Sequence, residues 1–173
     1  MGSTAALHAL NALFPHGDCA GKALGIAQSD ELSGALTLAF SLLTVNGTGL
    51  EGQFDSRVPI CASDENCRAA AEVSFSTFGF SVSGEMDAPH HTPADSPLVK
   101  ALLKCYEQYT DYKGECLAIG GGTYVHDIPG GVAFGCCMPG FNGNMHGADE
   151  HTCIADQLTA AKIFTQAIID LCG

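Results

Sequence analysis

Residues 35–58 run ALTLAFSLLTVNGTGLEGQFDSRV, and this stretch decides the fold of the N-terminal half. From Leu36 to Leu42, apolar residues alternate with small or polar ones, which is the two-residue period of a half-buried strand. Residues 46–49 tolerate positive φ and predict a turn, and residues 50–58 predict a returning strand. The stretch is therefore expected to form a β-hairpin.

Helices are predicted on either side of this hairpin. Thr4–Phe14 carries apolar residues at helical spacing. Ser63, followed by two acidic residues, is a typical N-cap for a helix over residues 68–78. Residues 80–84 alternate again and begin one more predicted strand, which runs out at Pro89. The order helix, strand, strand, helix, strand over residues 3–88 favours a ferredoxin-like sandwich that lacks its first strand.

A second domain is predicted after residues 90–95, a proline-containing stretch without hydrophobic periodicity. Beyond it, Ser96 and Pro97 predict the start of a helix, and residues 117–119 and 132–134 predict short buried strands. A long helix closes this α/β part, residues 94–173. Its predicted apolar face consists of Ile154, Leu158, Ala161, Phe164, Ile168 and Leu171.

The composition excludes several classes of function. Hydrophobic residues make up 46% and charged residues 15% of the 173-residue chain, which is typical of a folded protein. The 19 acidic and 7 basic residues give a net charge of -12, which disfavours nucleic acid and anionic membranes as partners. No apolar run approaches the roughly 20 residues of a membrane-spanning helix. The nine cysteines are odd in number and contain no CxxC pair, so reduced cytoplasmic thiols are expected.

Three places could carry chemistry, and each has a plainer alternative. The glycines at 120–122 follow a predicted strand, where a ligand could approach the backbone or the chain could simply make a tight turn. His146 lies in a polar loop before the closing helix, as a candidate zinc ligand or a surface histidine. Arg57 ends an apolar strand and could clamp a carboxylate through two hydrogen bonds, or form a surface pair with Asp55.

Six motifs follow one another along the chain. They are FDSRVP (54–59), HTP (91–93), IGGGTY (119–124), GVAFG (131–135), MPG (138–140) and HGADE (146–150). In this order the last four, together with the final helix, resemble the end of the aminoacylase and carnosinase superfamily of zinc peptidases. The closest resemblance is to bacterial PepV-like, Xaa-His dipeptidases. FDSRVP is similar to a strand of their lid domain, and HTP to the return into their catalytic domain.

The resemblance implies a fold and a chemistry. Residues 3–88 correspond to most of a lid domain, and residues 94–173 to the C-terminal segment of an α/β catalytic domain. In the intact family enzyme, two zinc ions bridged by a carboxylate would hold the water that attacks the peptide bond of a dipeptide. The positions implied for this chain are His146 as the last zinc-ligand histidine, Glu150 beside it in the motif, Arg57 as the lid residue that contacts the substrate carboxylate, and Gly121, Gly122 and Thr123 in the loop that lines the substrate pocket.

The chain also departs from the family pattern. It contains no Glu-Glu pair, and its HxD sequence, His16 to Asp18, lies in the lid-like part, where we interpret it as accidental. No catalytic set is complete, so this chain alone is predicted to be inactive and to bind no zinc stably. The alternative is a non-catalytic binding or assembly module derived from the fold. A lid that lacks one strand exposes a sheet edge, which favours a homo-oligomer.

Overall fold

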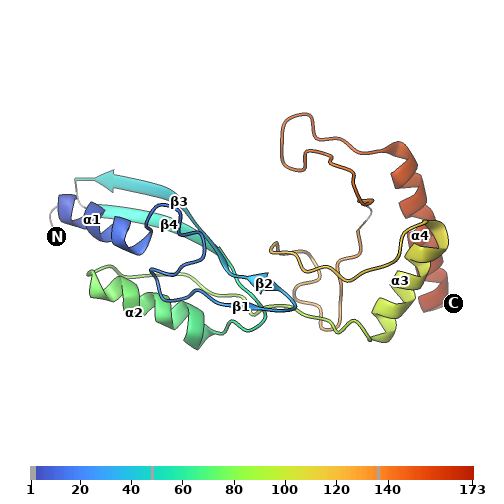
Figure 1. Cartoon of the computed structure of the whole chain (residues 1–173), viewed down its shortest axis with the longest axis horizontal. Helices are drawn as coiled ribbons and strands as arrows, with labels where there is room; N and C mark the ends of the chain where they lie inside the picture. Colours follow the sequence, from blue (N-terminus) through green and yellow to red (C-terminus); the bar gives the residue numbers. More distant parts are fainter. Residues whose placement is uncertain (1–2, 48, 136) are drawn as a thin grey trace. The chain divides into compact units, whose positions relative to one another are not determined.

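The computed structural model describes residues 3–47, 49–135 and 137–173. They form two compact units. The first contains the residues up to His90 together with Ala118–Gly122, and the second contains His91–Leu117 and Thr123–Gly173. The helices and strands (Figure 1) are α1 (Ser3–Leu13), β1 (Ser29–Asp30), β2 (Gly34–Ala35), β3 (Thr37–Asn46), β4 (Gly49–Arg57), the short π-helix η1 (Asp64–Arg68), α2 (Ala69–Thr77), α3 (Pro97–Tyr109) and α4 (Ile154–Cys172).

The first unit is built on the antiparallel hairpin of β3 and β4, in which Thr37 pairs with Arg57. A register irregularity between Phe40 and Leu42 interrupts the ladder. One extra residue reverses the side that the following side chains face. Leu38, before the bulge, is buried, whereas Leu42, Leu43 and Val45 beyond it are all exposed. The predicted hairpin is confirmed, but the predicted alternation holds only as far as this bulge. Thr48, in the predicted turn, lies outside the described residues.

Helices α1 and α2 pack on the hairpin around an aromatic cluster. The ring of Phe14 lies 4.8 Å from that of Phe40, 5.7 Å from Phe54 and 5.8 Å from Phe75, measured between centroids. Phe75 of α2 also stacks on Phe54 of β4 at 5.4 Å. Such pairs add to the stabilisation from burial. The buried residues of this core are Leu13, Leu24, Ile26, Leu36, Leu38, Ala62, Cys67, Ala71 and Phe75.

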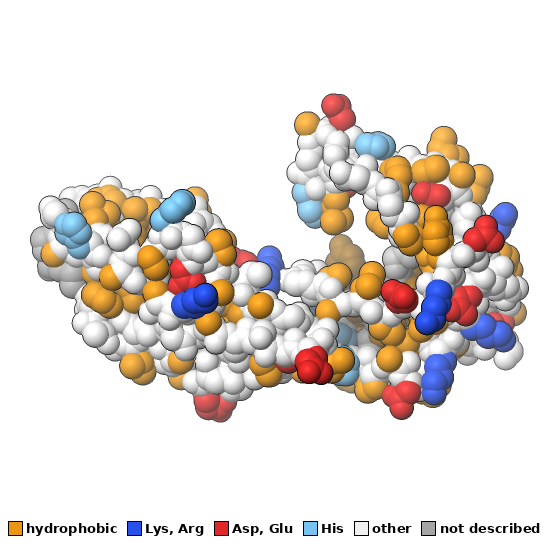
Figure 2. Space-filling model, viewed as in Figure 1, with side chains coloured by type: hydrophobic (Ala, Val, Ile, Leu, Met, Phe, Trp, Pro, Cys, Tyr) orange, Lys and Arg blue, Asp and Glu red, His pale blue; other side chains and the backbone are white. Residues whose placement is uncertain are grey.

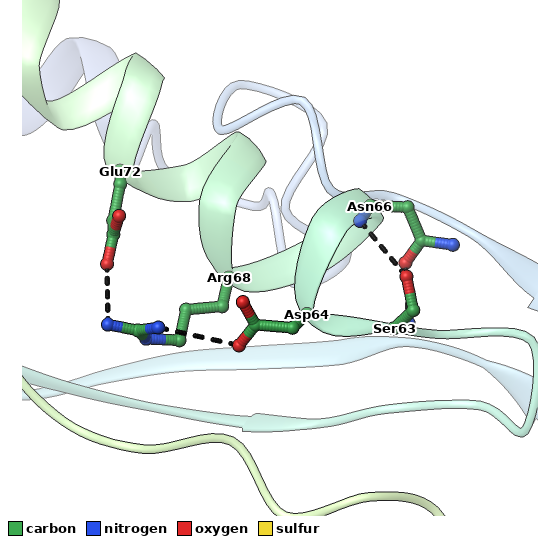
Figure 3. Close-up of polar contacts among 5 residues, drawn as sticks. All are labelled: Ser63, Asp64, Asn66, Arg68 and Glu72. Carbon is green, nitrogen blue, oxygen red and sulfur yellow. Dashed lines mark hydrogen bonds and ion pairs between the residues drawn. The ribbon is translucent and has the colours of Figure 1, made fainter.

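Ser63 begins the helical segment that leads into α2, as predicted. Its Oγ accepts a hydrogen bond from the Asn66 backbone N–H at 3.3 Å, and Asn66 Oδ1 accepts one from the Ser63 N–H at 2.7 Å. These two bonds form a capping box (Figure 3). Arg68 then pairs with Asp64 at 3.5 Å and with Glu72 at 2.8 Å, one turn to either side. Local polar contacts therefore fix where this helix starts.

Asp30 ties the short β1–β2 ribbon to the segment after β4. Its carboxylate accepts hydrogen bonds from the backbone N–H of Ser33 at 2.6 Å, Leu32 at 2.9 Å and Cys61 at 3.2 Å, and from the Ser33 hydroxyl at 2.7 Å. These bonds, chiefly the one from the Ser33 backbone, favour the charged form and lower the pKa of Asp30 to about 2. Asp30 is thus a structural carboxylate.

The second unit is centred on α3 and α4, which pack antiparallel. Cys105 lies 3.7 Å from Asp170, between Sγ and Oδ2, and the Tyr109 hydroxyl donates to Gln166 Oε1 at 3.1 Å. The helix predicted from Ser96 is confirmed, since the Ser96 Oγ accepts a hydrogen bond from the first turn of α3. The buried core of this unit consists of Leu102, Cys105, Met138, Ile163 and Ala167.

The long closing helix is confirmed as α4, but its buried face is not the predicted one. The face toward α3 consists of Ala160, Ile163 and Ala167. The predicted face, which includes Leu158 and Ile168, is mostly exposed. Figure 2 shows hydrophobic side chains at the surface over this helix. The prediction was wrong because α4 is apolar on two sides, and periodicity does not tell which side contacts α3.

Three predicted strands are absent from the part of the chain that the structure describes. Residues 80–84 form no sheet hydrogen bonds, because no strand lies beside them. Residues 117–119 and 132–134 are likewise irregular, and Leu117 is exposed rather than buried. A strand needs a paired backbone, which the hydrophobic pattern of one segment cannot supply.

The chain is a mixed helix-and-sheet protein, which agrees with the predicted α+β class at this coarse level. Both two-stranded sheets lie in the first unit. There the predicted hairpin lies between helices α1 and α2 in the chain, but the short β1–β2 ribbon, which was not predicted, precedes it. The ferredoxin-like lid and the catalytic-domain segment stay predictions. Among the described residues, no helix combines the length and apolar character needed to cross a bilayer.

Candidate functional site

Arg57 is the last residue of β4, where its side chain stands at the surface. The side chain is 52% exposed, and its Nε lies 3.2 Å from Oδ1 of Asp55, which is 56% exposed. The two residues are neighbours on the same face of the strand, so the simple surface pair that the sequence allowed is present. This pair uses Nε, so the terminal guanidinium nitrogens do not take part in it. They present hydrogen-bond donors toward solvent, in the planar geometry that suits a carboxylate.

The glycine-rich segment lies beside Arg57. A Cβ placed on Gly120 would lie 3.5 Å from Arg57 Cβ and 3.6 Å from its Cγ, which is van der Waals contact. Open space surrounds the equivalent positions of Gly121 and Gly122. The first unit thus brings together an arginine and a backbone without side chains from distant parts of the sequence. This arrangement could bind a small anion such as a carboxylate.

Thr123 begins the turn after the glycines. It is exposed, and its carbonyl oxygen accepts a hydrogen bond from the His126 N–H at 3.0 Å. The approach of Gly120 to Arg57 is the one contact of this site that sequence reasoning missed. A contact between residues so far apart in the chain has no signature in the sequence of either segment.

His146 lies in an exposed loop of the second unit with its backbone in the left-handed region, at φ 62°. Asn144 is also left-handed, and its carbonyl oxygen accepts the Gly147 N–H at 2.7 Å. The loop is closed at its base by a hydrogen bond from the His151 N–H to the Gly143 carbonyl oxygen at 2.9 Å. Local turns therefore position His146, with its imidazole available at the surface.

The neighbours of His146 do not assemble a metal site within the described residues. His151 Nδ1 lies 2.9 Å from the Asp149 carbonyl oxygen, and its ring packs edge-on against Phe141 at 5.5 Å. Glu150 is exposed. No group of three His, Cys, Asp or Glu side chains in the described ranges could share a metal ion. A zinc site needs three or four protein ligands, so these residues do not form a complete zinc site. His146 could supply one of the ligands.

The HxD sequence at residues 16–18 forms part of a turn. Asp18 accepts hydrogen bonds from the backbone N–H of Ala23 at 2.8 Å, Lys22 at 3.1 Å and Ala20 at 3.2 Å. These bonds, led by the one from Ala23, lower the pKa of the Asp18 carboxyl. The carboxylate is thus occupied in shaping the loop before β1.

An exposed arginine beside a glycine-rich backbone, on a mixed helix-and-sheet fold, defines a candidate site for a ligand that carries a carboxylate. The chain belongs to peptidase family M20/M25/M40, whose sequence model matches residues 2–170. The predicted peptidase family is thereby confirmed.

Two relatives show how much of a family protein the chain represents. It is 40% identical over 157 residues to "Putative dipeptidase YtjP" of Bacillus subtilis, and the match covers 90% of this chain and 33% of that protein. It is 32% identical over 157 residues to "Beta-Ala-Xaa dipeptidase" of Lactobacillus delbrueckii subsp. lactis, and this match also covers 90% of this chain and 33% of that protein. The chain therefore spans about a third of the length of the curated relatives that it matches.

Proposed function

We propose that this chain is the C-terminal part of a zinc-dependent dipeptidase and contributes substrate-binding residues and one metal ligand to it. The observation that carries the proposal is the 40% identity to a relative named as a dipeptidase, across nearly the whole chain. Family membership supports hydrolysis of peptides with a metal ion. The Arg57 surface supports a role for the first unit in binding the substrate carboxylate.

Each candidate residue then has a distinct role. Arg57 would hold the C-terminal carboxylate of the dipeptide through its terminal nitrogens, while Nε keeps its contact with Asp55. Gly121 and Gly122 would let the peptide backbone approach, because no side chain projects there. Thr123, the next residue in the chain, would be a further substrate-binding residue. His146, with Glu150 next to it in the loop, would offer an imidazole to a metal whose other ligands lie outside the described residues.

The proposed substrates are Xaa-His dipeptides, which the resemblance implies. The name of the Lactobacillus relative specifies β-alanine at the first position instead. The dipeptide β-Ala-His satisfies both descriptions, whereas Leu-His and β-Ala-Leu each satisfy one. Comparison of these three substrates therefore separates the two preferences.

The remaining proposals concern the state of the chain. We place the chain in the cytoplasm. The described cysteines, which do not include Cys136, have free thiols, in agreement with this proposal. As a second candidate we keep a non-catalytic binding module derived from the same fold. The lack of a group of three metal-binding side chains among the described residues favours that candidate for the chain acting alone.

A chimeric enzyme tests the proposal. This chain would replace the matched third of the Bacillus subtilis relative, and hydrolysis of the three dipeptides would be measured with zinc. We expect an active chimera that prefers β-Ala-His and Leu-His. Arg57→Ala should raise KM more than it lowers kcat, because it removes a contact to the substrate carboxylate. His146→Ala should abolish turnover.

Two controls make the result decisive. Arg57→Lys keeps the charge but loses the bidentate geometry, so it should fall between the wild type and Arg57→Ala. His8→Ala removes an exposed histidine of α1 and should leave turnover unchanged. A folded chimera without activity, or one indifferent to His146→Ala, would contradict the proposed function.

A further inference from the structure

Asp55 contacts the guanidinium of Arg57 at its inner end. The two residues are two positions apart in β4, so their side chains leave the strand on the same face. Oδ1 of Asp55 lies 3.2 Å from Nε of Arg57. A guanidinium can receive a carboxylate side-on, through Nε and one terminal nitrogen, or end-on, through both terminal nitrogens. Because Asp55 lies at Nε, it leaves the end-on edge to a second carboxylate.

The base of the Arg57 side chain has a second neighbour. A Cβ placed on Gly120 would lie 3.5 Å from Arg57 Cβ and 3.6 Å from its Cγ, so the glycine backbone runs beside the first two carbons of the side chain. The Asp55 contact comes at the far end, at Nε. An unrestrained arginine has many rotamers, and fixing them opposes binding. The two contacts restrict both ends of this side chain.

The neighbouring strand provides no competing charge. In the register of the hairpin, Thr37 of β3 lies opposite Arg57, and Ala39 lies opposite Asp55. Both are short, uncharged and exposed. Residues that lie opposite each other are the ones whose side chains interact across a strand pair. Among the ion pairs of the described residues, Asp55 is therefore the carboxylate that holds Arg57.

We propose that Asp55 is a positioning residue for substrate binding. It would hold Nε so that the end-on edge of Arg57 is already directed outward when the C-terminal carboxylate of a dipeptide arrives. The proposal rests on the proposed function, in which Arg57 binds that carboxylate. Asp55 acts through Arg57 and does not touch the substrate. Its contribution is preorganisation, which lowers the entropy lost on binding.

The charge of Asp55 has an effect of opposite sign. A second negative group near the site repels the substrate carboxylate, so removal of the charge alone would lower KM. Loss of the positioning contact would instead raise KM. We expect positioning to prevail, because the substrate would lie across the guanidinium from Asp55, in exposed surroundings where water and salt weaken the repulsion. The direction of the change in KM therefore separates the two effects.

Substitutions of Asp55 in the chimera test the proposal with Leu-His as substrate. Asp55→Ala should raise KM about two- to fivefold and leave kcat nearly unchanged, as expected for the loss of an exposed ion pair that serves binding. Asp55→Glu keeps a carboxylate within reach of Nε and should recover most of the loss. Asp55→Asn keeps an oxygen there without the charge, so its KM should fall between those of the wild type and Asp55→Ala.

Glu51 provides a matched control on the same strand. It is an exposed carboxylate four residues before Asp55, or about 13 Å along β4. This separation exceeds the screening length of about 10 Å at ordinary ionic strength. Glu51→Ala removes the same charge without touching Arg57, so it should leave KM unchanged.

Two further measurements connect the effect to Arg57 and to the substrate carboxylate. Adding Asp55→Ala to the Arg57→Ala chimera should change KM no further, because the residue through which Asp55 acts is gone. Leu-His amide has no C-terminal carboxylate, so Asp55→Ala should not alter its KM. General damage to the site would impair the amide as well.

The positioning contact can also be measured in the isolated chain. In isotope-labelled protein, NMR relaxation reports the motion of the Arg57 Nε–H bond as an order parameter. This order parameter should fall in Asp55→Ala and recover in Asp55→Glu. The Nε–H signal of Arg68, which pairs with Asp64 and Glu72, is the internal control and should not change.

The outcomes separate this inference from the proposed function. If Arg57→Ala leaves KM unchanged, the proposed carboxylate contact fails and the role of Asp55 fails with it. If Arg57→Ala raises KM but Asp55→Ala leaves KM unchanged or lowers it, this inference alone is overturned and the proposed function stands. An Arg57 order parameter indifferent to Asp55→Ala would also overturn the inference. The NMR measurement needs no chimera, so it tests the contact whether or not the chimera is active.

Discussion

At the scale of single residues, Arg57 tests how much an exposed ion pair contributes to the stability of the fold. Both partners of the Asp55–Arg57 contact are more than half exposed, and a pair of that kind stabilises a fold by about 0 to 1 kcal/mol. We therefore expect Arg57→Ala to change the free energy of unfolding in urea by less than about 1 kcal/mol. In the chimera, the same substitution should slow dipeptide hydrolysis by raising KM.

The opposite result would change the interpretation of Arg57. Replacing Arg68, which pairs with two carboxylates at the start of α2, gives a matched comparison with a more connected arginine. If Arg57→Ala destabilised the chain by several kcal/mol, about the cost of breaking a buried pair, then its role would be structural and the proposed carboxylate clamp would lose its support.

Asp30 makes a prediction about pH. Its pKa of about 2 lies below the ordinary value of 3.8, so the folded state favours the charged form. Because the folded pKa is the lower one, the stability that Asp30 contributes is present above about pH 4 and is lost as the pH falls toward about 2. Asp30→Asn should therefore lower the urea midpoint of unfolding at pH 7. The difference in midpoint between the variant and the wild type should become smaller as the pH falls from about 4 to about 2.

A neighbouring residue provides the control for Asp30. Glu31 is exposed, and Glu31→Gln removes the same charge one position along the chain. We expect its midpoint to follow the wild type across the whole pH range. A constant difference between Asp30→Asn and the wild type down to pH 2 would show that the hydrogen bonds of Asp30 do not act through its charge.

Residue roles were predictable to the extent that they depend on local sequence. The Ser63 N-cap and the possible Asp55–Arg57 pair follow from residues close together in the chain, and the structure contains both. The contact between Arg57 and Gly120 depends on the tertiary fold, so no local pattern predicted it. The turn around Asp18 shows the reverse case. Its HxD sequence matches a metal-ligand motif, but the Asp18 carboxylate accepts backbone hydrogen bonds within the loop.

At the scale of elements, α4 has two apolar faces with one isoleucine to test on each. Substituting each isoleucine measures how much its face contributes to the free energy of unfolding. Ile163 faces α3 and is 3% exposed, whereas Ile168 is 63% exposed. Ile163→Ala should cost about 2 to 5 kcal/mol in urea unfolding because it leaves a cavity. Ile168→Ala should cost no more than about 0.5 kcal/mol, as expected of a surface change. Equal costs would mean that the outer face is also covered in solution.

Helices and the hairpin were predictable because their periodicity and caps lie within one segment, as in α3 with Ser96 at its start. The strands predicted at 80–84 and 117–119 failed for a different reason. A strand requires a partner, and the described residues provide none for either segment. The bulge between Phe40 and Leu42 also escaped prediction, because alternating hydrophobicity is compatible with either register.

At the scale of the whole molecule, the chain spans a third of its relatives' length and leaves many apolar side chains exposed, including Leu117 at 82% and Ile154 at 78%. Exposed apolar surface of this extent favours association. We expect the isolated chain to bind a hydrophobic dye such as ANS, and Leu158→Gln with Ile168→Gln to reduce the signal. Dye binding unchanged by these substitutions would place the accessible apolar surface elsewhere than on α4.

The last prediction concerns metal and activity together. We expect the isolated chain to retain less than one zinc ion per molecule and to hydrolyse none of the three dipeptides. The residues nearest to His146 in sequence that could act as ligands are Asp149, Glu150 and His151, and the structure does not bring three donors together there. A lone imidazole in water holds zinc too weakly to survive removal of excess metal.

The measurement is zinc content after metal-stripped chain is incubated with zinc and freed of the excess, followed by the dipeptide assay. His146→Ala and His151→Ala are the matched variants, and the intact Bacillus subtilis relative is the positive control. One zinc per chain that disappears with His146→Ala but persists with His151→Ala, together with turnover, would contradict the prediction. The other ligands would then come from a second chain or from an unrecognised set in this chain, because a single imidazole cannot activate a water molecule without them.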